Sequence, residues 1–435
     1  MKEVQDFVAK LDNEGERSMT EGPYKLPEGW QWVKLGEVCQ HRTGIWGPEA
    51  SDPAQGFPIV RSTEIEGFRI RPQGASIRVV RTTQVEAYKL ESGDILVSKS
   101  SGSPHLVGWP AIFEDPKDGK VYLFSNFMLR LRSDRRRLEP WFLLYYLHSP
   151  IARSVYLGAQ DTTSGLRNLR VREFLAQPIP LPPLEEQKRI VARIEELMGR
   201  VREARRLREE AKQEAERLWQ AVLAQTFPRP GSELPEGWQR VRLGEVCDYK
   251  SGVWAQADPD GIPVLRSTDF LPDGSLSYGT AIRLALSEKQ LRKSILQPGD
   301  ILLERSGGGP NKPVGRVAYF QGQGTYCFGN FITCLRVSRA DVEPKFLFYY
   351  LFHFHISGRT EPLQTQTTNI RNLRFNEYLA ITIPLPPLEG QKRIVAHLQE
   401  VQEKIKALKE AQAQTEAELK RLEQAILEKA FRGEL

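Results

Sequence analysis

Residues 26–39 read LPEGWQWVKLGEVC, and residues 234–247 read LPEGWQRVRLGEVC. Twelve of these fourteen positions are identical, at an offset of 208 residues. The repetition runs through the rest of the chain, since RNLR at 167–170 returns at 371–374. A period of this length is far above the ~20–50 residues of solenoid repeats. The 435-residue chain therefore consists of two similar modules in tandem, which predicts pseudo-two-fold symmetry.

The first part of each module contains many turn signals between short β-branched or aromatic runs. Pro-Glu-Gly at 27–29 and Asp-Gly at 260–261 are typical of turns, and the runs 57–61 and 121–124 are typical of short strands. This alternation predicts a mixed globular domain. A Phe-Leu-x-Tyr-Tyr-Leu segment follows Glu-Pro in both modules, which favours a buried helix with proline in its first turn.

A long helix is expected after each module body. The stretch 184–227 contains no proline and one glycine, Gly199. Its apolar residues step alternately by four and three, which is the 3.5-residue period of a coiled-coil seam, and the second copy does the same. The seam positions are Ile190, Ile194, Leu197, Val201, Ala204, Ala211, Ala215, Leu218 and Val222, then Ile394, Leu398, Val401, Ile405, Leu408, Leu419, Leu422 and Ile426.

Polar residues interrupt both seams near their middle. Arg208 interrupts the first seam, and Gln412 and Thr415 interrupt the second. If the helices pair antiparallel with Ile190 level with Ile426, Arg208 lies level with Leu408 and close to the second interruption. A polar seam residue fixes the register of a coiled coil at some cost in stability.

These patterns predict an α+β fold with two tandem mixed α/β domains, separated by two long helices that pair as an antiparallel coiled coil. We expect a leader at 1–22, the first module at 23–183, the first helix at 184–227, the second module at 228–387 and the second helix at 388–435.

The chain has a net charge of +6, and its excess of positive charge lies in the module bodies. The first body has 21 basic and 16 acidic residues, and the second has 18 and 15. The helices are nearly balanced, with ten basic and nine acidic residues in 184–227 and eight of each in 388–431. This distribution fits modules that contact a polyanion and helices that contact protein.

Composition and motifs exclude several classes of protein. The longest apolar runs have seven residues, too few for the roughly 20 of a membrane span, and the charged N-terminus is unlike a signal peptide, so we expect a cytoplasmic protein. The four cysteines lack metal-site spacing and are expected to be buried, reduced thiols. The sequence contains no phosphate loop, dinucleotide fingerprint, HExxH zinc motif or Asn/Asp-Pro-Pro-aromatic motif of adenine methyltransferases. These absences argue against catalysis by the chain itself.

Some polar residues have simple structural interpretations. Asp94 and Asp300 follow glycine at turns and are expected to cap them. His353 and His355 are expected to lie at the surface or in packing rather than to bind a metal. Trp46 and, in the second module, Trp254 could stack on a base or sugar, but core packing is favoured for them.

Basic residues beside turn signals are the candidates for nucleic-acid contact. Lys99 and Arg305 each stand beside small donors in a Gly- and Ser-rich stretch, where such groups can bind phosphates or guanine edges. An ordinary solvated loop remains an alternative for every candidate. The full set is Arg42, Arg61, Lys99, Arg167, Arg170, Lys250, Arg266, Arg305, Lys312, Arg371 and Arg374.

Two paired motifs resemble a known family. Leu-Pro-Glu-Gly-Trp with Leu-Gly-Glu-Val stands at 26–38 and 234–246, and Pro-Leu-Pro-Pro-Leu-Glu-x-Gln-Lys-Arg-Ile-Val-Ala begins at Pro180 and Pro384. Two copies of each, in this order around two variable modules, resemble the specificity (S) subunits of type I restriction–modification systems over roughly residues 20–435.

The resemblance implies that each module is a target recognition domain that reads one half of a split sequence in double-stranded DNA. It implies that the long helices set the distance between the halves and dock two methyltransferase (M) subunits. A restriction and motor (R) subunit is expected to join for cleavage. The chain itself is expected to be non-catalytic and to bind no cofactor, with S-adenosylmethionine and ATP on the partner subunits.

The starts of the two long helices lie where this family is expected to contact its partners. Glu186 in the first copy is replaced by Gly390 in the second, so the two docking faces are expected to differ. The candidate docking residues are Glu185, Gln187, Lys188, Glu389, Gln391 and Lys392.

Other functions remain open at the level of sequence. The chain could be the S subunit of a type IIB-like enzyme, whose partner fuses methyltransferase and nuclease. It could also be a self-contained DNA-modifying enzyme, a coiled-coil scaffold or an RNA-binding protein. The absence of catalytic motifs argues against the self-contained enzyme, and a preference for one split duplex sequence would argue against a scaffold or RNA-binding role.

Overall fold

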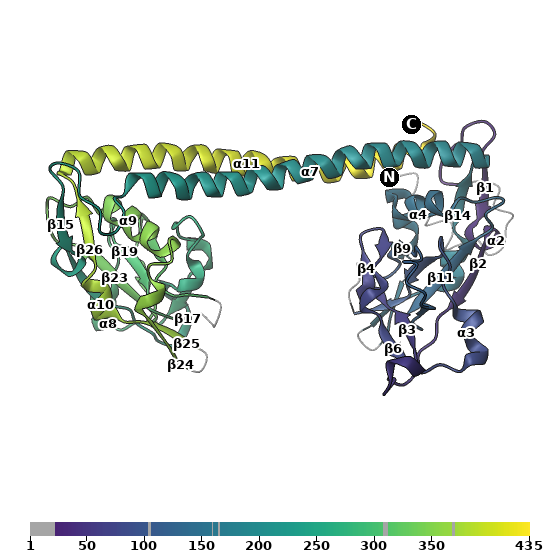
Figure 1. The fold of residues 1–435 in the computed structure, drawn as a ribbon, viewed down its shortest axis with the longest axis horizontal. Helices are drawn as coiled ribbons and strands as arrows, with labels where there is room; N and C mark the ends of the chain where they lie inside the picture. The colour runs from purple at the N-terminus through teal and green to yellow at the C-terminus, as the bar shows by residue number, and fades with distance from the viewer. Residues whose placement is uncertain (1–21, 103–105, 159, 164–165, 308–311, 368–369) are drawn as a thin grey trace. The chain divides into compact units, whose positions relative to one another are not determined.

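A computed structural model describes residues 22–102, 106–158, 160–163, 166–307, 312–367 and 370–435 (Figure 1). The chain divides into two compact units. Unit 1 comprises residues 1–207 and 414–435, and unit 2 comprises residues 208–413. Each unit therefore combines one module body with part of both long helices, α7 (Leu184–Thr226) and α11 (Leu388–Arg432).

The body of unit 1 is built on a sheet in the order β2-β11-β7-β9-β5-β4, with smaller sheets β10-β3-β6, β12-β13-β8 and β1-β14 around it. The central strands are β2 (Cys39–Thr43), β11 (Met128–Ser133), β7 (Ile95–Ser98), β9 (Pro110–Ile112), β5 (Arg69–Ile70) and β4 (Ile65–Glu66). The others are β10 (Leu123–Phe124), β3 (Phe57–Val60), β6 (Ser76–Arg78), β12 (Gln160–Thr163), β13 (Leu166–Leu169), β8 (Ser100–Ser101), β1 (Gln31–Lys34) and β14 (Pro178–Leu181).

Apart from the long helices α7 and α11, the helices in the described part of unit 1 are short. They are α2 (Leu35–Val38), α3 (Thr82–Tyr88), α4 (Pro140–His148), α5 (Pro150–Gly158) and α6 (Val171–Ala176). As the sequence predicted, α4 begins with its proline in the first turn, and most of its side chains are buried. It forms the centre of the core of this unit.

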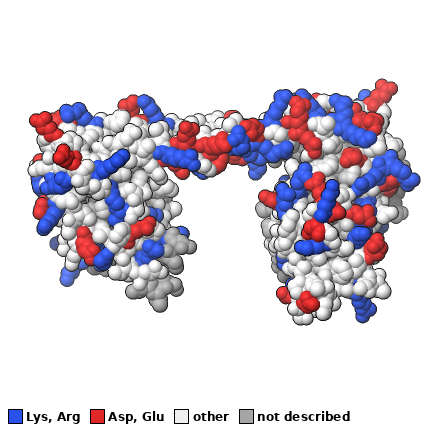
Figure 2. Space-filling view, in the orientation of Figure 1, with Lys and Arg blue, Asp and Glu red and all other residues white. Residues whose placement is uncertain are grey.

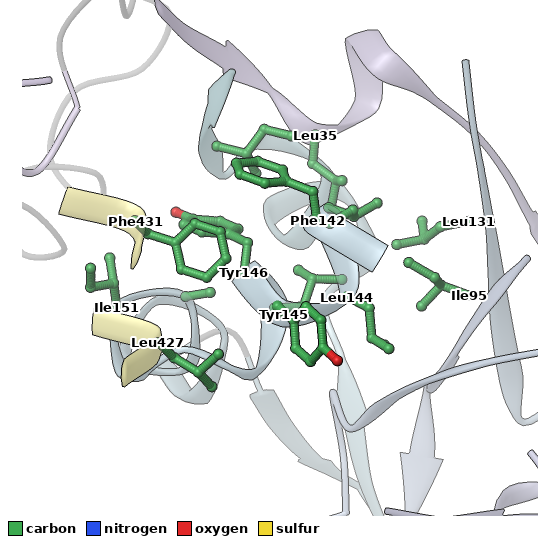
Figure 3. Packing of buried hydrophobic residues seen from close by; sticks show 14 of the residues in the cluster. Leu35, Ile95, Leu131, Phe142, Leu144, Tyr145, Tyr146, Ile151, Leu427 and Phe431 are labelled. Carbon is green, nitrogen blue, oxygen red and sulfur yellow. The ribbon is translucent and has the colours of Figure 1, made fainter. Parts of the chain in front are cut away.

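The last turns of the chain complete that core. In Figure 3, Phe431 and Leu427 of α11 lie among side chains of α4. The fully buried Phe431 ring packs edge-on against Phe142 and Tyr146, with 5.2 Å between centroids in both cases. The Tyr24 hydroxyl donates to the carbonyl of Phe431 at 2.6 Å. The core of unit 1 thus joins the first and last parts of the sequence.

Unit 2 repeats this plan with sheets β16-β23-β19-β21, β18-β17-β22, β20-β25-β24 and β15-β26. The strands are β16 (Cys247–Ser251), β23 (Ile332–Val337), β19 (Ile301–Glu304), β21 (Val317–Tyr319), β18 (Ile282–Leu284), β17 (Ala257–Leu265), β22 (Cys327–Phe328), β20 (Ser306–Gly307), β25 (Ile370–Leu373), β24 (Gln364–Thr367), β15 (Gln239–Arg242) and β26 (Thr382–Leu385). In the described part of unit 2, the helices beside α7 and α11 are α8 (Glu288–Ser294), α9 (Pro344–Ile356) and α10 (Phe375–Leu379). Phe227, just after α7, packs on Phe346 and Tyr350 of α9 at 5.7 and 5.4 Å.

The long helices pair antiparallel within each unit. In unit 1, the start of α7 packs against the end of α11, and Arg205 forms an ion pair with Glu423 at 2.7 Å. In unit 2, the end of α7 packs against the start of α11, and Glu216 lies 3.7 Å from Lys409. The predicted α+β class, the tandem modules and the antiparallel helix pair are confirmed. The five-part division of the chain stays a prediction.

The register of the helix pair differs from the one we expected. In the expected register, Arg208 lies level with Leu408, and Glu216 lies level with position 400. In the structure, Arg208 donates to the carbonyl of Gln412 at 2.7 Å and Glu216 contacts Lys409, so the partners lie four and nine residues further along α11. The helices are thus displaced by about one heptad, which a repeating seam permits. The polar interruptions still meet, as the hypothesis required.

The buried stripe also departs from the predicted seam. Leu218, Leu408 and Leu422 are 54, 43 and 49% exposed, whereas Met198 and Leu223 are buried. A strict 3.5-residue stripe drifts around a helix that has 3.6 residues per turn. Contacts with the module cores also select which side chains are covered, because both units pack their helices on the module body as well as on each other.

Candidate nucleic-acid interface

The turn between β10 and β11, residues Ser125–Met128, is the point in unit 1 where candidate segments meet. The N–H of Ser125 donates at 2.9 Å to the carbonyl of the residue just before Arg61. The carbonyl of Phe127 accepts the N–H of Lys99 at 2.8 Å. These backbone bonds hold the segments that carry Arg61 and Lys99 beside one turn, although the two residues are far apart in sequence.

The turn between β22 and β23, residues Gly329–Ile332, repeats this arrangement in unit 2. The N–H of Gly329 donates at 2.8 Å to the carbonyl just before Arg266. The carbonyl of Phe331 accepts the N–H of Arg305 at 2.8 Å. We call these two features the β10–β11 turn and the β22–β23 turn.

A small sheet adds one further candidate to each turn. β13 pairs with β8, and the Ser100 hydroxyl donates to Asn168 Oδ1 at 2.5 Å. In unit 2, β25 pairs with β20, and Ser306 contacts Asn372 in the same way at 2.7 Å. The candidate arginine that precedes each asparagine is thereby held close to the turn.

Several candidate arginines are engaged in local ion pairs. Arg61 contacts the buried Glu64 at 2.8 Å, and Glu64 also accepts the N–H of Arg61 at 2.6 Å. Asp269 holds Arg266 in the corresponding way in unit 2. Arg170 and Arg374 pair with the glutamates three residues later, at 2.7 Å in both cases. These carboxylates orient the guanidinium groups and neutralise part of their charge.

The candidates differ in exposure. Arg42, Arg167, Arg305, Lys312 and Arg374 are exposed, and Arg61, Lys99, Arg170, Lys250, Arg266 and Arg371 are partly buried. Lys312 lies outside the two strands that flank the β22–β23 turn. Figure 2 shows basic and acidic side chains intermixed on both module bodies.

In unit 2 two of the candidates, Arg305 and Arg374, line an open concavity of about 430 Å³. Its walls include Arg305, Asn372, Arg374 and Phe375. The Arg305 guanidinium lies 5.7 Å from the Phe375 ring centroid, which holds this long side chain over the concavity by a cation–π contact. The arrangement offers cations, an amide and a hydroxyl on one surface, which is the set of groups that binds phosphates and base edges.

The interpretation of the two tryptophans as core residues was wrong. Trp46 and Trp254 are 39 and 55% exposed. A glycine, Gly44 or Gly252, stands two residues before each tryptophan. Its backbone lies so close to the neighbouring turn that a Cβ atom on the glycine would come within about 2 Å of a carbonyl oxygen. This close approach takes the chain past the turn and leaves the indole near the surface.

Phe127 and Phe331 are the residues at these turns that sequence reasoning missed. They are 51 and 49% exposed. The only signal was that Asn-Phe occurs at equivalent places, 126–127 and 330–331, but a lone phenylalanine in a strand-rich stretch favours a core assignment.

Two of the six candidate docking residues are structural. The Gln187 side chain is fully buried, accepts the N–H of Glu139 at 2.8 Å, and donates to the carbonyls of Arg137 and Pro182 at 2.8 Å. Gln391 is equally buried and makes the equivalent bonds in unit 2. These amides join each long helix to its module, so the expectation that they contact a partner is not supported.

The other four docking candidates remain accessible. Lys188 lies 2.7 Å from Glu185, and Lys392 lies 2.8 Å from Glu389. The hydrogen bond to the carboxylate raises the pKa of each lysine. All four side chains are exposed on the first turn of α7 or α11. Their role in partner contact stays a prediction.

The simple structural interpretations agree with the contacts found. Asp94 and Asp300 each accept the N–H three residues earlier at 2.8 Å, and each also pairs with an arginine of the central sheet. Burial lowers the pKa of His353 and of His355 to about 4, and the His353 ring stacks on Phe227. Within the described residues, no cluster of three or more His, Cys, Asp or Glu side chains is placed to hold a metal ion.

Residues 27–213 and 235–418 match the family model of the type I restriction modification DNA specificity domain. The chain belongs to this family. Both turns described above lie inside the matched segments of the specificity domain, one in each copy. Among the helices of the described regions, none has the length and apolar character needed to cross a bilayer.

Curated members of the specificity family resemble the chain over nearly its whole length. The type I restriction enzyme StySPI specificity subunit of Salmonella potsdam is 27% identical, with 94% of this chain and 90% of the relative covered. The putative MjaX specificity subunit of Methanocaldococcus jannaschii is 24% identical, with 93 and 94% covered.

Solved structures of the family are similar as well. The HsdS subunit from Thermoanaerobacter tengcongensis is 35% identical, with a TM-score of 0.58, and the match covers 96% of this chain and all of that one. A chain from a study of complex assembly and conformational transition of the type I restriction–modification system is 34% identical, with a TM-score of 0.71 and coverage of 95 and 100%. Membership of the specificity family identifies DNA sequence recognition as the general function.

Proposed function

We propose that this chain is the non-catalytic targeting subunit of a type I restriction–modification complex, and that each module reads one half of a bipartite target in double-stranded DNA. The observation that carries the proposal is the duplicated construction of the β10–β11 and β22–β23 turns. Two equivalent surfaces, each with basic, amide and hydroxyl groups, suit two half-sites on one duplex.

The antiparallel helices act as the spacer between the half-sites in this proposal. Because the two modules are joined, binding of one half-site makes binding of the second effectively intramolecular. The exposed helix starts, with Glu185, Lys188, Glu389 and Lys392, are the proposed contacts for two methyltransferase subunits. The exposed Leu218, Leu408 and Leu422 add apolar surface to the helices for the same purpose.

The chemistry resides on the partners in this proposal. S-adenosylmethionine is bound by the methyltransferase subunits, and ATP by a restriction and motor subunit, while this chain binds no cofactor. The basic and amide groups at the two turns can bind and orient DNA, which is the part of the reaction assigned to this chain.

The proposal is tested by long-read methylation sequencing of cells that express the partner subunits with and without this chain. The expected result is adenine methylation at one split motif that depends on the chain. Methylation that is unchanged when the chain is absent, or that occurs at a single uninterrupted motif, would contradict the proposal.

A further inference from the structure

The most exposed large apolar side chains at the two turns are Phe127 and Phe331. Each ring is about half exposed, at 51 and 49%, while its backbone is fixed. The Phe127 carbonyl accepts the N–H of Lys99, and the Phe331 carbonyl accepts those of Arg305 and Ser306 at 2.8 and 3.2 Å. Each ring is therefore presented to solvent by a rigid turn and not by a loose loop.

The exposure of these rings is repeated although the residues that flank them within the turn differ. The turns read Ser-Asn-Phe-Met at 125–128 and Gly-Asn-Phe-Ile at 329–332, so only Asn-Phe is common to both. A phenylalanine ring left in water forgoes the stabilisation that burial provides. The same uncovered ring at equivalent places in both modules indicates a ligand that both modules share.

The groups around each ring indicate which ligand this is. Asn126 and Asn330 are exposed beside the rings, and Lys99 or Arg305 stands between two neighbouring strands, β7 and β8 or β19 and β20. Lysine is depleted from the cores of protein interfaces, which disfavours a protein partner at the turn that Lys99 contacts. Duplex DNA, by contrast, offers phosphates to cations, base edges to amides, and base or sugar faces to an apolar wedge.

We propose that Phe127 and Phe331 each press against the bases of one half-site of the target duplex. This inference rests on the proposed function. A phenylalanine ring carries no hydrogen-bonding group with which to distinguish base edges, so the ring makes a sequence-tolerant contact. It positions the module on the duplex, while the neighbouring polar groups distinguish the bases.

The test compares Phe331→Ala with wild type in the complex reconstituted with methyltransferase subunits. The probe is a fluorescein-labelled duplex that carries the split motif found by methylation sequencing, and anisotropy is measured at several salt concentrations. Loss of the burial of this half-exposed ring predicts roughly 4- to 15-fold weaker binding. The salt dependence is expected to stay unchanged, because the ring carries no charge, whereas Arg305→Ala lowers the slope by about one.

Leu271→Ala is the matched control, because Leu271 is a 44% exposed apolar residue of the same module that lines a groove beside α9 and α11 instead of the turn. It should bind as wild type does. Phe331→Leu keeps an apolar side chain without a ring and should lie between wild type and Phe331→Ala, with the thermal midpoint of each variant as a check on folding.

The inference would be overturned if Phe331→Ala bound with wild-type affinity, if Leu271→Ala weakened binding equally, or if Phe331→Ala changed the recognised sequence. Each of these results would leave the proposed function intact. No preference of the wild-type complex for the split duplex would instead overturn the proposed function and this inference with it.

Discussion

A substitution at Phe431 tests whether the last turn of α11 is part of the core of the first module. Its ring is fully buried between Phe142 and Tyr146, at 5.2 Å from each. Replacing a buried phenylalanine with alanine costs about 3–5 kcal/mol, because apolar contacts are lost and a cavity remains. At about 1.4 kcal/mol per factor of ten, Phe431→Ala should raise the opening equilibrium of this core by roughly 10²-fold or more.

Hydrogen exchange with mass spectrometry measures this effect separately in the two units. We expect faster exchange in peptides from α4, with little change in α9, because core amides exchange through local or global opening. Phe227→Ala is the matched control, since Phe227 packs on Phe346 and Tyr350 of α9 and should have the reverse effect. Unchanged exchange in α4, or a larger change in α9 than in α4, would refute the assignment of Phe431 to the core of unit 1.

Deleting one heptad from both α7 and α11 shortens each helix by about 10.5 Å. The gap between the half-sites should therefore fall by roughly three base pairs, while both half-site sequences stay unchanged. Methylation sequencing measures both, and altered half-sites with an unchanged gap would contradict the prediction. Gln187→Ala leaves the Glu139 N–H and two carbonyls without their hydrogen-bond partner. The free energy of unfolding, measured in urea, should therefore fall by about 2–4 kcal/mol. A fall of less than about 0.5 kcal/mol would contradict a structural role for the buried amide. Burial lowers the pKa of His148 to about 3, below its unfolded value of ~6.5. The unfolded state therefore binds more protons, and stability should fall as pH drops from about 6.5 towards 3. In His148→Gln the thermal midpoint should fall less steeply with decreasing pH, and a slope equal to that of the wild type would show that His148 is not the cause.

The sequence was informative where a pattern repeats or has a fixed period. The duplicated motifs identified the tandem modules, and the 3.5-residue stripe predicted both long helices. The stripe could not fix the register, because a heptad shift returns equivalent positions to the seam. The exposure of Leu218 and the burial of Met198 depend on how each helix also packs on its module body.

The candidate site could be predicted only in part. Basic residues beside turns were found by their positions, but their convergence depends on backbone bonds between distant segments, such as Lys99 with Phe127. Gln187 was assigned to partner contact because motif residues of a family can serve either docking or folding, and only its burial separates the two. Phe127 was missed because sequence alone does not reveal which apolar residue of a strand-rich region lies outside the core.

The most direct test of the central claim is exchange of one module. Residues 25–180 are replaced with the equivalent segment of a family member that has a different target, and the methylation motif of the hybrid complex is determined by long-read sequencing. The account predicts that one half-site changes to that of the donor, while the other half-site and the gap are retained. A motif that changes in both halves, or that remains entirely as in the wild type, would contradict the claim that each module reads its own half.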